Sequence, residues 1–120
     1  MSLDVYLRLP GTREPIQLLD VTDDSGEVFS ANITHNLGRM ASEAGVYQCC
    51  WWPEEVGVTH AKQLVAPLRA GIAAMKADPD RFKAHDSPNG WGLYRHFLPW
   101  LERYLAACEQ HPDAEVRVSR

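Results

Sequence analysis

The sequence contains no long apolar run and no cluster of basic residues. No stretch approaches the roughly 20 apolar residues that a membrane-spanning helix needs, and the chain begins MSLDVYL, without the basic and apolar regions of a secretory signal. Its 12 lysines and arginines are outnumbered by 16 acidic residues, so the formal net charge is −4. A protein that neutralises nucleic-acid phosphates needs the opposite balance. We therefore expect a soluble, cytoplasmic protein with neither a nucleic-acid nor a membrane partner.

Cysteine is scarce, and its spacing suits neither disulfides nor zinc. The chain has three cysteines, of which Cys49 and Cys50 are adjacent, a spacing at which a disulfide between them would be strained. Neither a Cys-x-x-Cys nor a His-x-x-His spacing occurs, and the phosphate-loop, dinucleotide-binding and Gly-x-Ser-x-Gly motifs are absent. We expect free thiols, no metal and no cofactor, and no motif assigns a catalytic residue.

Charge is also scarce in one stretch, residues 28–53, where Arg39 and Glu43 are the two charged residues. The same stretch holds an adjacent tryptophan pair and a cluster of asparagine and histidine. Such a segment is typical of a core or of a pocket wall. Because adjacent tryptophans cannot easily share a face, we expect one of Trp51 and Trp52 in the core and the other partly exposed.

Within this stretch we predict a helix over residues 32–44. Asn32 is a good N-cap residue, and Gly45 suits the position just after a helix. At about 100° per residue, one arc of such a helix is apolar and faces the core. A second arc carries polar side chains, namely those of Asn32, His35, Asn36, Arg39 and Glu43.

Strand patterns lie near both ends of the chain. Apolar and polar residues alternate over residues 3–9, and a second alternating segment covers 115–119, which is the period of half-buried strands. Short apolar runs at 16–21 and 28–30 flank a turn-forming Asp-Asp-Ser-Gly cluster and predict further strands. We expect the two ends of the chain to pair in one sheet, with Val116 and Val118 against residues 3–9.

Helical patterns fill the middle and the C-terminal half. We predict a short turn at Pro53 that ends at Gly57, and a longer helix capped by Thr59 and kinked or broken at Pro67. A short helical turn restarts at Asp78-Pro79, and another long helix, with a kink expected at its internal proline, follows the Asn-Gly-Trp-Gly sequence of residues 89–92. For residues 46–52, strand and buried coil both stay open.

These elements predict one domain over residues 1–120 of the α+β class. We expect a small, mostly antiparallel sheet of three to four strands, with the N- and C-terminal strands in the same sheet. About three helices should cover one face of it.

Four segments are characteristic in sequence: NITHNLGRMA (residues 32–41), NGWGLY (89–94), YLAAC (104–108) and PDAEVRVSR (112–120). Together they resemble a family of small uncharacterised proteins from bacteria and phages. The matching segments are spread over most of the chain. The resemblance implies a self-contained single domain and assigns no catalytic residue.

The polar arc suggests a site that holds a polar or anionic small ligand between the 32–44 helix and the NGWG loop, residues 89–92. Arg39 can clamp an anion, amides can orient a ligand, and tryptophan can stack on a flat one. The candidate ligand-binding residues are Asn32, His35, Asn36, Arg39, Trp52, Asn89, Trp91 and Tyr94.

Three alternatives stay open. The polar arc can simply satisfy backbone groups of the neighbouring loop or sheet edge. The chain can be a protein-interaction domain or homodimer with an aromatic interface, or a small hydrolase or transferase that uses His35 as a base. Within the arc, we expect a structural role for Asn32 and pocket roles for His35 and Arg39.

Overall fold

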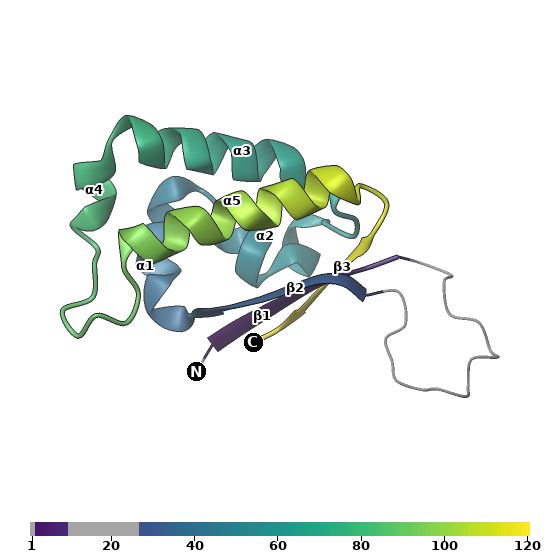
Figure 1. Cartoon of the computed structure of the whole chain (residues 1–120), viewed down its shortest axis with the longest axis horizontal. Coiled ribbons are helices and arrows are strands. Elements are labelled where there is room, and N and C mark those ends of the chain that lie inside the picture. The colour runs from purple at the N-terminus through teal and green to yellow at the C-terminus, as the bar shows by residue number, and fades with distance from the viewer. Residues whose placement is uncertain (1, 10–26) are drawn as a thin grey trace.

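The computed structural model describes residues 2–9 and 27–120 (Figure 1). Its strands are β1 (Ser2–Arg8), β2 (Glu27–Thr34) and β3 (Glu115–Ser119). Its α-helices are α1 (Gly38–Ala44), α2 (Tyr47–Trp51), α3 (Lys62–Ala77), α4 (Pro79–Lys83) and α5 (Tyr94–Gln110). Two 3₁₀ turns, His35–Leu37 and Pro53–Val56, complete the described elements. The strand and turn predicted over residues 16–26 lie outside the described residues.

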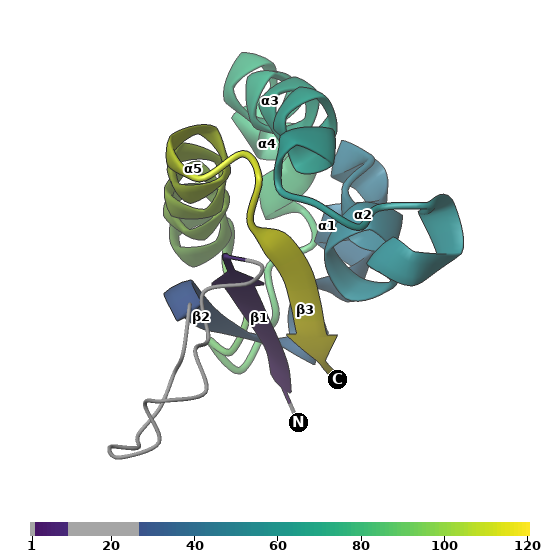
Figure 2. The same cartoon turned by 90° about the vertical axis from the view of Figure 1, so that its right-hand side faces the viewer.

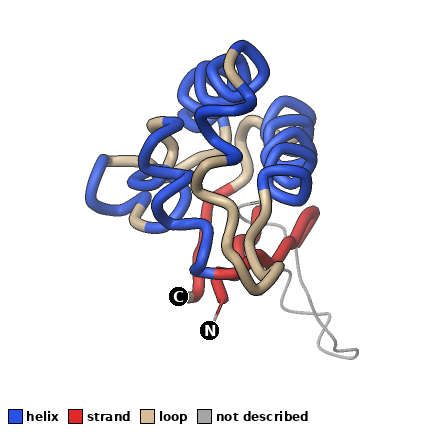
Figure 3. The backbone as a smooth tube through the Cα atoms, turned by 90° about the vertical axis from the view of Figure 1, so that its left-hand side faces the viewer, coloured by secondary structure: helices blue, strands red, loops and turns tan. Residues whose placement is uncertain are grey.

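The described strands form one antiparallel sheet in the order β2-β1-β3, with β1 in the centre. In its register, Val5 of β1 lies opposite Ala31 of β2 and Val118 of β3. The two ends of the chain therefore meet in one sheet, as predicted, and Figure 3 shows N and C close together beside the strands. The alternating pattern of β1 explains its central place in the sheet. Its apolar residues Leu3, Val5 and Leu7 all point to one face, and that face is buried in the core.

The helices lie on one side of this sheet and make a second layer (Figure 2). The fold is therefore α+β, a three-stranded sheet with five α-helices among the described residues. The helix α5 packs over β2, where the rings of Tyr104 and Phe29 stack with their centroids 5.8 Å apart. Trp100 and Tyr104 belong to the buried face of α5, together with Phe97 and Leu101.

The predicted helix over residues 32–44 is wrong in its first half. Asn32 and Ile33 instead continue β2, opposite Asp4 and Leu3. Thr34 is extended, with φ −73° and ψ 146°, and its Oγ1 accepts the N–H of Asn36. The chain then enters the 3₁₀ turn, and α1 begins at Gly38. Pairing with β1 satisfies the backbone of these residues, and tertiary pairing of this kind overrides a helical pattern.

The helix end at Gly45 is confirmed, because Gly45 has φ 80° and its N–H bonds to the last turn of α1. Residues 46–52 form neither strand nor coil; most of them lie in α2. The N–H of Val46 bonds to the Ala41 oxygen at 2.9 Å, so the chain reverses sharply and a second short helix starts. Trp51 is buried and Trp52 half-buried, which confirms the division expected for the pair.

The remaining helix predictions are mostly confirmed. The turn that starts at Pro53 ends at Gly57, and α4 starts at Pro79. The helices α3 and α5 run continuously through their internal prolines. Thr59 is not the cap of α3, which begins at Lys62; instead the Gln63 side chain accepts the N–H groups of Thr59 and His60 at 2.7 and 2.9 Å.

Candidate ligand-binding site at the end of β2

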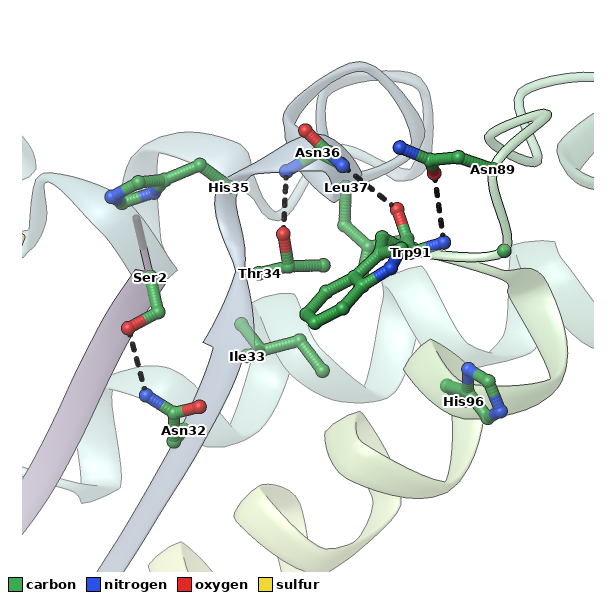
Figure 4. A pocket seen from close by; sticks show the side chains of 12 residues that line it. Ser2, Asn32, Ile33, Thr34, His35, Asn36, Leu37, Asn89, Trp91 and His96 are labelled. Atoms are coloured by element: carbon green, nitrogen blue, oxygen red, sulfur yellow. Dashed lines mark hydrogen bonds between the residues drawn. The ribbon is translucent and has the colours of Figure 1, made fainter.

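A hollow of about 860 Å³ lies where β2 ends and the NGWG loop passes beside it (Figure 4). Its walls come from the start of β1, the end of β2, the 3₁₀ turn, the loop and the first turn of α5. The lining residues are Ser2, Asn32, Ile33, Thr34, His35, Asn36, Leu37, Asn89, Gly90, Trp91, Gly92 and His96. Five of the predicted site residues are therefore brought together here: Asn32, His35, Asn36, Asn89 and Trp91.

The NGWG loop has a fixed shape. Asn89 Oδ1 accepts the Trp91 N–H at 2.9 Å and the Ser87 hydroxyl at 2.5 Å, which is an Asx-turn arrangement. Gly90 and Gly92 have positive φ values of 80° and 108°, which other residues rarely adopt. The Asn89 side chain thus stabilises this turn, and the two glycines allow its backbone angles.

The loop is also fastened to the 3₁₀ turn. Asn36 Nδ2 donates to the Trp91 carbonyl at 3.0 Å. A Cβ at Gly92 would lie 3.0 Å from Asn36 Cβ and 3.3 Å from Leu37 Cγ, so the missing side chain allows the two segments to touch. Two segments more than 50 residues apart in the sequence therefore form one continuous wall.

These bonds settle the orientation of both asparagine amides. Because Asn36 donates to a carbonyl, its nitrogen faces Trp91 and its Oδ1 is left over. Because Asn89 accepts an N–H, its oxygen is engaged and its Nδ2 is left over. Neither left-over atom has a hydrogen-bond partner among the described residues. The two amides, drawn near each other in Figure 4, offer one free acceptor and one free donor.

Trp91 is the most exposed large hydrophobic residue in the described part of the chain, at 69%. Its backbone N–H and carbonyl are both bonded, to Asn89 and Asn36. The backbone that carries the indole is therefore fixed at the edge of the hollow, while the side chain is largely open to solvent. Ile33, which is half-buried, adds apolar surface to the same hollow.

His35 contributes differently from what the sequence predicts. Its Nδ1 accepts the Nε1–H of Trp51 at 2.9 Å, and Trp51 is 2% exposed. A neutral imidazole that accepts at Nδ1 carries its proton on Nε2, so the remaining ring nitrogen is a donor. His35 therefore lines the hollow and also has a structural partner in Trp51.

Asn32 is not a helix cap. It lies on β2, where its Nδ2 donates to Ser2 Oγ at 2.9 Å and to Asp4 Oδ1 at 2.6 Å. These bonds cross to β1 on the solvent side of the sheet, and Asn32 is exposed. Its side chain therefore braces the β1–β2 pair at the rim of the hollow.

Three predicted site residues lie outside this hollow. Tyr94 is buried, and its hydroxyl donates to the Met75 carbonyl at 2.9 Å. Trp52 packs under the Arg120 guanidinium, 3.9 Å from the ring centroid. Arg39 lines a second hollow of about 410 Å³, together with Asn36, Ala84, His85, Asp86, Ser87, Pro88 and Asn89.

Sequence reasoning missed several lining residues. Ser2 reaches the hollow because it pairs with Thr34, and that register needs the sheet. His96 lies one helical turn after the NGWG loop, a spacing that was visible in the sequence. Ile33 lies within the helix predicted over residues 32–44, but the structure places it on a strand beside the hollow.

The buried thiols make no second reactive site. Cys49, Cys50 and Cys108 are free and buried. Burial raises the pKa of Cys108 to about 12, and a hydrogen bond with Cys49 together with burial raises the pKa of Cys50. The same bond lowers the pKa of Cys49, which stays enclosed in the core. Thiols that are closed off from solvent in this way are typical of core packing.

No known protein family, curated protein or solved structure matches this chain. The resemblance to small bacterial and phage proteins therefore stays a prediction. In the two described ranges, no group of three or more histidine, cysteine or acidic side chains is placed to hold a metal ion. Nor does any helix within those ranges combine the length and apolarity needed to cross a bilayer.

Proposed function

We propose that this chain binds a small polar ligand with a flat apolar part in the hollow between the end of β2 and the NGWG loop. The observation that carries the proposal is the combination of fixed backbone and exposed ring at Trp91. Both of its backbone polar groups are bonded within the protein, while 69% of the residue is exposed. An exposed indole held at a hollow is suited to stacking on a planar group.

The polar groups of the hollow favour a ligand with a donor beside an acceptor. Asn36 Oδ1 is free to accept, and Asn89 Nδ2 is free to donate. A carboxamide or the edge of a nucleobase presents the complementary pair. Because both amides are fixed by Trp91, a ligand would lose little affinity to ordering them.

Catalysis by His35 as a base has less support. A base needs an unprotonated nitrogen within reach of the substrate. In His35 that nitrogen is Nδ1, which already accepts from Trp51, so Nε2 is left as a donor. A donor at the edge of the hollow suits the binding of a carbonyl or an anion better than proton abstraction.

A homodimer through an aromatic interface has less support too. A stable interface buries roughly 800 Å² on each partner, and one tryptophan side chain supplies about 200 Å² of that. The other exposed large hydrophobic residue of the described chain is Val56, at 49%, on a different segment. An isolated indole beside a hollow therefore favours a small ligand over a protein surface.

Native mass spectrometry of protein purified from its source cells, without a refolding step, tests the proposal. We expect a monomer that retains a small molecule of defined mass, and we expect Trp91→Ala to lose that molecule without losing its fold. Val56→Ala is the matched control, because it removes the other exposed apolar side chain and should retain the adduct. A dimer that carries no adduct and becomes monomeric on Trp91→Ala would favour the interface instead.

A further inference from the structure

We propose that the ligand also carries a phosphate group and that this group binds beside Arg39 in the second hollow. The ligand class is then a heteroaromatic ring joined to a phosphate, as in a nucleoside monophosphate. The inference rests on the proposed function, because the flat part of the same molecule would lie against Trp91.

The two hollows adjoin each other. Asn36 and Asn89 line both of them. A single ligand that meets these two amides can therefore extend into the larger hollow on one side and into the smaller hollow on the other. The larger side offers apolar surface and Trp91, whereas the smaller side is lined mainly by polar residues.

Arg39 gives the smaller hollow a cation that is free to bind an anion. Its side chain is exposed and forms no ion pair with any described residue. Four other arginines are engaged by carboxylates: Arg69 by Glu109, Arg81 by Glu43, Arg117 by Glu115 and Arg120 by Glu54. The remaining described arginines, Arg8, Arg95 and Arg103, form no ion pair either, but they line neither hollow. A guanidinium without a carboxylate presents paired N–H donors that match the oxygens of a phosphate.

The carboxylate of Asp86 should repel a phosphate in the smaller hollow, so replacing it tests whether charge governs binding there. It lines the same hollow, and its Oδ1 accepts the Tyr94 N–H at 2.7 Å, where α5 begins. That bond explains why a carboxylate is present there. Asparagine would keep an oxygen for the Tyr94 N–H and remove the negative charge, so Asp86→Asn should strengthen phosphate binding.

The experiment compares nucleosides with their 5′-monophosphates by calorimetric titration of the full chain, with inorganic phosphate as a further probe. We expect the tightest-binding nucleoside to gain roughly two- to fivefold in affinity when it carries the phosphate, as is usual for one exposed charge pair. Arg39→Gln should remove this gain and leave nucleoside affinity unchanged. Arg103→Gln, which changes an exposed arginine that lines neither hollow, should keep the gain. Asp86→Asn should increase it, and added salt should reduce it.

The outcomes separate this inference from the proposed function. If nucleoside and nucleotide bind equally, or if Arg39→Gln keeps the gain, the phosphate site is wrong while ligand binding in the larger hollow stands. If nucleotide binding is lost in Arg39→Gln but is unchanged in Trp91→Ala, the flat part does not use the larger hollow, and the proposed function fails. If neither class binds, the nucleotide inference is overturned.

Discussion

Replacing His35 with alanine should destabilise the fold, although His35 lines a solvent-facing hollow. Trp51 Nε1 donates to His35 Nδ1 at 2.9 Å, and the tryptophan is 2% exposed. In His35→Ala the indole N–H has no protein acceptor, and a buried unsatisfied donor costs roughly 1–3 kcal/mol. For a chain of this length, each kcal/mol lowers the melting temperature by about 3–6 °C.

Two variants make this test specific. His35→Asn places an oxygen near the position of Nδ1, so it should recover most of the loss. Asn32→Ala removes bonds to Ser2 and Asp4 on the exposed side of the sheet, where water replaces them, so it should cost less than about 1 kcal/mol. Urea unfolding curves give these free energies. The nuclear magnetic resonance signal of the Trp51 indole proton reports the bond itself.

Either of two results would contradict a stabilising role for the His35–Trp51 hydrogen bond. A His35→Ala protein that unfolds at the same urea concentration as the wild type would mean that the Trp51 donor is satisfied elsewhere. A His35→Asn protein as unstable as His35→Ala would mean that the imidazole ring matters for its packing rather than for its acceptor.

Three further results should follow from the fold. Gly92→Ala should destabilise the protein more than Gly90→Ala in thermal melts: both glycines have positive φ, but the added methyl would press on Asn36 at 3.0 Å in the first case and meet nothing within 4 Å in the second. Equal losses would contradict the close contact. Deleting residues 115–120 should lower the urea midpoint sharply, because β3 pairs along β1, and an unchanged midpoint would refute that role. At pH 8 the three thiols should react slowly with a thiol reagent in the native protein and all should react after denaturation. Folding raises the pKa of Cys108 from 9.0 to about 12, so the unfolded chain loses this proton first and the free energy of unfolding should fall as pH rises between these values.

Much of the sheet was readable in the sequence, because strand periodicity is a local signal. The alternation from Leu3 to Leu9 and the valines of β3 each specify a buried and an exposed face. Two such strands at opposite ends of a single domain had few other partners. Gly45 and Gly57 likewise marked the ends of two elements correctly. Both have a positive φ, a conformation that glycine adopts far more readily than other residues.

The candidate site was harder to predict from the sequence, because it depends on how residues 32–34 pair with β1. Residues 32–34 fit a helical pattern on their own, and their place on β2 is decided by Asp4 and Leu3, about 30 positions away. Once they join the strand, the predicted polar arc is divided. Asn32 then points across the sheet, His35 bonds to Trp51, and Arg39 lies beside the smaller hollow.

Contact between the turn and the loop was expected, but its chemistry depends on three-dimensional detail. The sequence shows that Asn36, Asn89 and Trp91 are polar or aromatic residues in segments of low charge. It does not show that Asn89 accepts the N–H of Trp91 while Asn36 donates to the carbonyl of the same residue. Those two bonds fix which amide atoms are left for a ligand.

Two-dimensional nuclear magnetic resonance can show directly whether a ligand binds in the hollow between the end of β2 and the NGWG loop. The isotope-labelled chain would be titrated with a panel of flat polar compounds that includes nucleosides and carboxamides. We expect a binding compound to shift the Trp91 indole signal together with the side-chain amide signals of Asn36 and Asn89, and we expect Trp91→Ala to abolish these shifts. If no compound moves these three signals at millimolar concentration, or if the shifts concentrate on another face of the described chain, the hollow beside β2 is not a ligand site.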